Sequence, residues 1–363
     1  MAFKFSRTPM EKQNTPSLIS YDASAAIKGL LMLLIIFGHT GMLTTNFVTG
    51  GRTLFWHWLY TFHVYVFFIL PFIYGYKKNT EKANSMGVID IQQVKNDLKH
   101  NLIKIGIPYC WFFLLAALVF VTVGGGEFSI GGTIYAFIFG TEPLLKQYIG
   151  FYVVWFLPSM LALLTLKSVW YNSNKAVKWV MLILSIALWI LTVFGVLSKS
   201  TIGKQVPFSL SNAFYFLLLG LIARLVVEKR FPAKYQCPIV LVLTLAMTIL
   251  FYLQSTMQWH SIVDLHTIFL LVMPVLMFLL LQGISDVIKK SRLLIFIGKY
   301  SLQIYIVHVF ILNALEWGFT HFLKPSIGIG VVIYIMALAI SAGLAILMVK
   351  VPIINKIMFP KSE

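Results

Sequence analysis

Long apolar stretches recur along almost the whole chain and constrain its fold more than any other feature. A helix needs about 20 apolar residues to cross the hydrocarbon core of a bilayer. Lipid cannot satisfy exposed backbone amide groups, so each crossing segment must be a helix that packs within a bundle. About ten stretches are long enough, at 25–43, 54–76, 103–123, 149–167, 177–197, 208–227, 238–254, 264–284, 293–317 and 327–349.

The composition excludes a soluble fold of ordinary type. Of the 363 residues, 59% are hydrophobic and only 11% are charged, too few to cover a water-exposed surface. The first apolar stretch is longer than the core of a typical signal peptide, and no small-residue cleavage signature follows it. We therefore expect an all-α, polytopic membrane helix bundle with about ten transmembrane helices.

The distribution of basic residues predicts how the bundle is oriented. The net charge of +17 would suggest a nucleic-acid partner if it formed one soluble patch, but here it is loop charge. Positively charged loops are retained on the cytoplasmic side. The chain has 29 basic residues. If both termini are cytoplasmic, the ones on the outer side are only Arg52, Lys146, Lys199, Lys204 and Lys324. This bias predicts cytoplasmic termini, an even number of spans and no nucleic-acid partner.

The same pattern predicts the organisation of the chain. Residues 1–24 form a cytoplasmic N-terminal tail, residues 25–349 the ten-helix membrane domain, and residues 350–363 a cytoplasmic C-terminal tail. The C-terminal tail is too short to fold alone. No repeat marks the two related halves that many transporters have.

Three histidines fall within predicted spans: His39 in the first, His63 in the second and His308 in the ninth. Ionisable groups inside the hydrocarbon are costly and by default indicate a functional site. Because successive spans run in opposite directions, all three lie in the central-to-outer part of the membrane. Histidine is the side chain best suited to accept a proton from a hydroxyl near neutral pH. A neutral imidazole bonded to a neighbouring helix explains any one of them alone, so the convergence of three favours a site.

Lys28 lies eleven residues before His39, nearly on the same helical face and about 16 Å away. A ligand with an anionic head and a thin arm could bind Lys28 and bring its far end to His39. Alternatively, Lys28 extends to the inner headgroups. A second basic cluster, Lys99, His100 and Lys104, fits either the phosphates of coenzyme A or anionic lipid.

Five groups of residues occur in the same order as the motifs of one membrane enzyme family. They are Lys28-Gly29 with Gly38-His39; Phe62-His63 with Phe67-Phe68 and Gly75-Tyr76; Ile107-Pro108-Tyr109; Trp155-Phe156-Leu157-Pro158; and Gly298-Lys299-Tyr300-Ser301-Leu302 with Tyr305 and His308. On these residues the chain resembles the acyltransferase 3 family, particularly its branch similar to fucose 4-O-acetylases. The resemblance covers nearly the whole chain.

The resemblance implies an integral membrane O-acyltransferase, in the cytoplasmic membrane of a bacterium, that moves an acyl group from acetyl-CoA to a carbohydrate hydroxyl. Three features depart from the family. Ala25 occupies the place of an acidic residue, and Asp22, one turn earlier, is the candidate substitute for it. Tyr65 stands where a proline is usual. The arginines common before the third span are Lys99, His100 and Lys104 here, which lack the bidentate grip of arginine on phosphate.

The residue roles follow from the resemblance and the chemistry together. His39 is the base, or carries the acyl group as a nucleophile, with His63 and His308 as further catalytic candidates. Lys28, Lys99, His100 and Lys104 bind the donor. Trp155 and Tyr305 bind the acceptor, a cell-surface saccharide or its lipid-linked precursor. Other aromatic residues toward the outer side, such as Trp56, Tyr60 and Tyr152, fit an interfacial belt.

Other chemistries and functions compete with this interpretation. No residues stand at metal-ligand spacing, so we expect neither a metal nor a permanently bound cofactor. A proton-coupled transporter or flippase for a sugar or lipid-linked saccharide would use the same histidines as a proton relay. A scaffold in a polysaccharide-assembly complex would leave them without a task. The sequence does not distinguish acetyl from a longer acyl group.

Overall fold

The computed structural model describes residues 18–47, 50–74, 89–124, 129–193, 208–228, 233–257 and 265–360. These residues form helices and no strand, apart from two isolated bridges. Seven helices among them are long and apolar enough to cross a membrane: Tyr21–His39, Ile91–Thr122, Tyr152–Tyr171, Lys175–Thr192, Pro238–Thr256, Ser301–Phe322 and Ile327–Lys350. The all-helical membrane class is therefore confirmed, whereas the count of ten and the cytoplasmic termini stay predictions.

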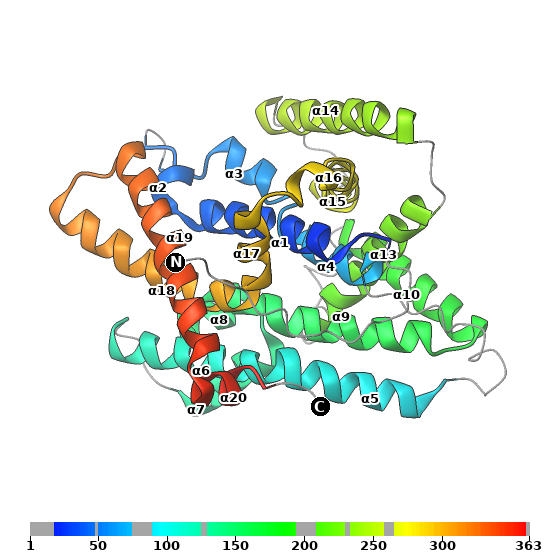
Figure 1. Ribbon diagram of the computed structural model, residues 1–363, viewed down its shortest axis with the longest axis horizontal. Coiled ribbons are helices and arrows are strands. Elements are labelled where there is room, and N and C mark those ends of the chain that lie inside the picture. The colour runs from blue at the N-terminus through cyan, green and yellow to red at the C-terminus, as the bar shows by residue number, and fades with distance from the viewer. Residues whose placement is uncertain are drawn as a thin grey trace.

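Helix α1 (Tyr21–His39) lies in the middle of the bundle, with α14 (Ala233–Met257) along one edge and α5 (Ile91–Asn101) along the opposite edge (Figure 1). The Ser20 side chain caps its N-terminus by accepting from the amide of Ala23 at 3.2 Å. At the other end the Thr40 hydroxyl donates to the carbonyl of Ile36 at 2.8 Å. The helix thus ends at His39, four residues earlier than the stretch 25–43 predicted.

The most extensive packing of α1 is against α17 (Arg292–Lys299). A Cβ atom on Gly29 would lie 2.0 Å from the carbonyl oxygen of Leu294, and one on Gly298 would lie 1.7 Å from that of Ala25. Only glycine permits this approach of the two backbones, as is common between membrane helices. Two of the motif glycines are therefore explained by contact between segments far apart in the sequence.

The expected span 54–76 is wrong as one continuous helix. It consists of α3 (Leu54–Leu59) and α4 (Tyr65–Ile73), joined by a turn at residues 60–64. Within the turn the Thr61 hydroxyl donates to the carbonyl of Trp58 at 2.7 Å, and His63 bonds the carbonyl of Leu59 at 2.7 Å. Such side-chain bonds compete with the helical ladder for backbone carbonyls.

The expected span 293–317 is also divided, at Tyr300, into α17 and α18 (Ser301–Phe322). The residues between the expected spans 54–76 and 103–123, by contrast, are helical from Ile91. Asp90 caps α5 by accepting from the amide of Gln93 at 3.0 Å. A π-helical turn, η2 (Leu102–Gly106), then joins α5 to α6 (Ile107–Thr122). Lys99 and His100 therefore lie on α5, and Lys104 on η2.

The other helices complete the bundle around this centre (Figure 1): α2 (Gly41–Thr44), α7 (Ile130–Phe139), α8 (Glu142–Ile149), η3 (Tyr152–Trp155), α9 (Phe156–Tyr171), α10 (Lys175–Val193), α13 (Phe208–Glu228), α15 (Leu265–Gly283), α16 (Ser285–Ile288), α19 (Ile327–Lys350) and α20 (Pro352–Met358). Residues 1–17 and 361–363 of the predicted tails, the outer lysines Lys199 and Lys204, and the Gly75-Tyr76 pair lie outside the described residues.

Candidate functional site

The fold brings two of the three predicted histidines into direct contact. His39 is the last residue of α1, and His308 is buried near the middle of α18. The Nδ1 atom of His39 lies 2.9 Å from Nε2 of His308, and the rings stack with centroids 5.1 Å apart. Residues 269 positions apart in the sequence thus form one imidazole pair.

Hydrogen-bond partners determine which nitrogen of each ring carries the proton. Nδ1 of His308 lies 2.7 Å from the carbonyl oxygen of Tyr305, which can only accept, so Nδ1 is the donor. In a neutral His308 ring, Nε2 then accepts, and Nδ1 of His39 must donate to it. The lone pair of His39 is therefore on Nε2, directed away from His308 and available to take a proton.

His63 approaches α1 but does not bond to His39. Its Nδ1 donates to the carbonyl of Leu59 at 2.7 Å, and its fully buried Nε2 has no hydrogen-bond partner among the described residues. A Cβ atom on Gly38 would lie 3.6 Å from this Nε2 atom. An unsatisfied acceptor is thus directed at the residue that precedes His39, where a ligand hydroxyl would satisfy it.

Aromatic side chains surround His39, and the sequence interpretation assigned them to an interfacial belt instead. The Trp56 indole donates to the carbonyl of Gly38 at 2.9 Å and stacks on Tyr60 with centroids 3.9 Å apart. The centroid of the His39 ring lies 6.3 Å from that of Tyr60 and 6.4 Å from that of Tyr152. The spacing of Trp56, Tyr60 and His63, at i, i+4 and i+7, was a signal of one shared face.

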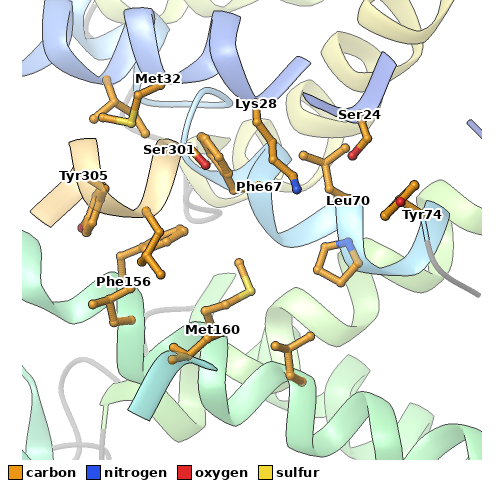
Figure 2. A pocket seen from close by; sticks show the side chains of 16 residues that line it. Ser24, Lys28, Met32, Phe67, Leu70, Tyr74, Phe156, Met160, Ser301 and Tyr305 are labelled. Atoms are coloured by element: carbon orange, nitrogen blue, oxygen red, sulfur yellow. The ribbon is translucent and has the colours of Figure 1, made fainter. Parts of the chain in front are cut away.

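A cavity of about 280 Å³ lies between α1, α4, α9 and α18 (Figure 2). Its walls are mostly apolar. The lining residues are Ser24, Lys28, Met32, Ile35, Phe67, Leu70, Pro71, Tyr74, Ile105, Phe156, Leu157, Met160, Leu164, Ser301, Leu302 and Tyr305.

Two polar groups in this cavity lack partners. Lys28 extends its side chain into the cavity (Figure 2), and no described carboxylate forms an ion pair with it. One turn earlier, the buried hydroxyl of Ser24 has no hydrogen-bond partner in the described part of the chain. An uncompensated ammonium group in apolar surroundings is costly, so these residues favour an anionic ligand.

The cavity leads from Lys28 toward the imidazole pair. Ser24, Lys28, Met32 and Ile35 line it from one face of α1, and His39 is the next residue on that face. On α18 the lining ends at Tyr305, one turn before His308, and the Tyr305 hydroxyl donates to the carbonyl of Val153. The cavity thus ends one helical turn short of the two histidines, beside a layer that contains Ile35 and Tyr305.

The other predicted residues lie elsewhere. Lys99, His100 and Lys104 are exposed and do not line the cavity. Trp155 stacks against Phe68 and Phe216, with centroids 6.2 and 6.5 Å away, within an aromatic cluster.

Near the start of α1, Ala25 is buried against Gly298, while Asp22 is exposed and forms no ion pair with Lys28. Asp22 therefore does not act on Lys28 as a direct partner. The described residues contain no group of three or more histidine, cysteine or acidic side chains that could hold a metal ion.

The arrangement suits transfer of a group between two ligands. An apolar cavity that contains a cation ends one helical turn from the imidazole pair, and partly exposed aromatic rings lie beside His39. A family model described as an acyltransferase domain, that of the acyltransferase 3 family, matches residues 22–346. Comparisons with curated proteins and with solved structures found no match.

Proposed function

The chain belongs to the acyltransferase 3 family and is a multi-pass membrane acyltransferase; on this premise we propose that it transfers an acetyl group from acetyl-CoA to a hydroxyl of a cell-surface saccharide or its lipid-linked precursor. The observation that carries the proposal is the Lys28 ammonium, which pairs with no described carboxylate, in a cavity that ends one helical turn from the imidazole pair.

The cavity supports a donor with an anionic head and a thin arm. The phosphate groups of coenzyme A bind the Lys28 ammonium and accept from the Ser24 hydroxyl at the Lys28 end. The pantetheine arm lies between apolar residues such as Met32 and Phe67. Its thioester then reaches Ile35 and Tyr305, one turn from His39 and His308. Movement of this thin layer completes the approach to His39.

The hydrogen-bond network supports His39 as the general base. Nε2 of His39 takes the proton of the saccharide hydroxyl while the hydroxyl oxygen attacks the thioester carbonyl. The resulting tetrahedral oxyanion collapses, the C–S bond breaks, and the proton on His39 passes to the thiolate of coenzyme A. His308 accepts from Nδ1 of His39 throughout, so it orients the ring and shares its positive charge.

His63 has a different role in this mechanism. As a neutral ring with its proton on Nδ1, it presents a lone pair at Nε2. It therefore accepts a hydrogen bond from a hydroxyl of the saccharide and does not donate one to an oxyanion. Trp56, Tyr60 and Tyr152 border the same side of His39 and provide aromatic surfaces for a sugar ring.

The transfer is tested with inverted membrane vesicles that contain the protein and acetyl-CoA labelled with ¹⁴C in the acetyl group. We expect label in the saccharide fraction, removable by mild alkali as an O-ester, and none with vesicles from cells lacking the gene. Stoichiometric label on the protein itself without acceptor would instead favour an acyl-histidine. Proton-driven sugar uptake without covalent label would contradict the proposal and favour a carrier.

Lys28→Met is expected to raise the KM for acetyl-CoA about tenfold, because it removes a charge-assisted bond to phosphate. The KM for the acceptor is expected to stay within about twofold of the wild-type value. Initial rates at varied acetyl-CoA and saturating acceptor measure the effect, and Lys28→Arg is the charge-preserving control. An equal rise in both KM values would show that Lys28 shapes the bundle and does not bind the donor.

A further inference from the structure

Lys167 continues the cavity-lining face of α9 by one turn. Leu157, Met160 and Leu164 line the cavity from α9, and Lys167 is three residues beyond Leu164 on the same face. Its Nζ atom donates to the carbonyl oxygen of Pro71 at 2.5 Å, and Pro71 itself lines the cavity. The ammonium group of Lys167 therefore lies beside a residue of the cavity wall, although Lys167 itself does not line the cavity.

The bond to Pro71 does not neutralise this charge. Pro71 is in the last turn of α4, where carbonyl groups lack helical partners, so Lys167 caps the helix with one of its three N–H donors. No described carboxylate forms an ion pair with Lys167. The nearest side-chain groups include the rings of Phe72 and Tyr171, with Nζ 5.9 and 6.0 Å from their centroids.

The charged groups near Lys167 are a second cation, Arg224, and two carboxylates, Glu228 and Asp97. Arg224, on α13, donates to the Tyr171 hydroxyl at 2.5 Å and lies over the same ring as Lys167. Its carboxylate partner is Glu228, which accepts from Arg224 Nε at 2.7 Å. Asp97 accepts from the Ser168 hydroxyl at 2.5 Å. The nearby carboxylates are thus bonded to groups other than Lys167, which stands close to a second cation.

We propose that Lys167 is the second phosphate-binding cation of the donor site and that it holds, together with Lys28, the diphosphate of coenzyme A. The inference rests on the proposed function. Lys28 of α1 and Met160 of α9 lie on opposite walls of the cavity (Figure 2), and Lys167 is two turns beyond Met160 on α9, so the two cations come from facing helices. Two ammonium groups match a group with two negative charges, and binding it removes the cost of two unpaired cations.

The same chemistry has a second source, the phosphate of a lipid headgroup. A lipid would reach Lys167 from the bilayer, whereas the diphosphate of coenzyme A would arrive through the cavity with its pantetheine arm. Coenzyme A and pantetheine share that arm and differ in the phosphates and the nucleoside. A variant of Lys167 that changes the affinity for coenzyme A but not for pantetheine therefore shows that Lys167 binds the part that pantetheine lacks.

The experiment is titration calorimetry of coenzyme A and of pantetheine into the full-length protein in phosphatidylcholine nanodiscs. Lys167→Met is expected to weaken binding of coenzyme A at least about tenfold and to change binding of pantetheine less than about twofold. Lys167→Arg is expected to retain most of the affinity because it keeps the charge. Lys175→Met, an exposed lysine at the start of α10, is the matched control and should leave both affinities unchanged.

Three results would overturn the inference. Equal loss of affinity for both ligands would indicate that Lys167 acts only as a cap on α4. Unchanged affinity for coenzyme A would indicate that Lys167 takes no part in donor binding. A loss that appears only when phosphatidylglycerol is added to the nanodiscs would assign Lys167 to a lipid headgroup. If the wild-type protein binds no coenzyme A, the proposed donor itself is wrong, which is a separate and recognisable outcome.

Discussion

Replacing His39 with alanine is expected to lower the rate of acyl transfer about 10²–10⁴-fold, the usual contribution of a positioned general base. The substitution removes the only nitrogen in the His39–His308 pair whose lone pair is free in the assigned tautomers. The measurement is the initial rate of label transfer from acetyl-CoA in membranes that contain equal amounts of each variant. Elution of the detergent-extracted variant from a size-exclusion column as a single symmetric peak would show that the bundle remains folded.

Two further histidine variants make the result specific. His321→Ala, at the exposed end of α18, should leave the rate unchanged. His308→Phe keeps a ring against His39 but removes its hydrogen-bond acceptor, so we expect a loss about tenfold smaller than that of His39→Ala. Near-normal transfer by His39→Ala would remove the proposed base. A larger loss in His308→Phe than in His39→Ala would assign the base to His308.

Replacing Gly298 with alanine is expected to reduce the stability of the bundle by about 3 kcal/mol, the upper part of the range for overpacked sites. The added Cβ would lie 1.7 Å from the Ala25 carbonyl oxygen, and the clash is with backbone on α1, which cannot rotate away. The helices must separate, although alanine favours helix by about 1 kcal/mol over glycine. The midpoint of thermal unfolding, followed by size-exclusion chromatography of heated samples, measures the loss.

Gly318→Ala provides the matched control, because Gly318 is also within a helix and no atom lies within 4 Å of a Cβ placed there. It is expected to be neutral or slightly stabilising. An unchanged midpoint for Gly298→Ala would mean that α1 and α17 are further apart than the structure places them. Lower activity at an unchanged midpoint would assign Gly298 to the site and not to packing.

Much of the helical framework was predictable because the apolar pattern is a local property. The expected stretches 208–227 and 327–349 correspond closely to α13 and α19. The stretches 54–76 and 293–317 did not predict the breaks that occur within them. At the break within 54–76, Thr61 and His63 bond backbone carbonyls in the turn, and hydropathy does not register such bonds.

The candidate site was predictable only in part. The face shared by Lys28 and His39 followed from the helical repeat, and α1 has this face in the structure. Lys167 was counted only as a cytoplasmic charge, because nothing in its sequence neighbourhood places it beside Pro71 of another helix. Lys99, His100 and Lys104 formed the more conspicuous basic cluster, yet they are exposed and outside the cavity. Density of charge along the chain does not indicate position in space.

The sequence alone determined the membrane class, the helical content and the family, since each depends on composition, on local periodicity or on motifs in a given order. The tertiary structure decided which residues meet. Contact between His39 and His308, and between Gly298 and Ala25, joins segments more than two hundred residues apart. Such contacts follow from how helices pack, and packing depends on the shapes of all the surfaces together, which no local pattern of residues contains.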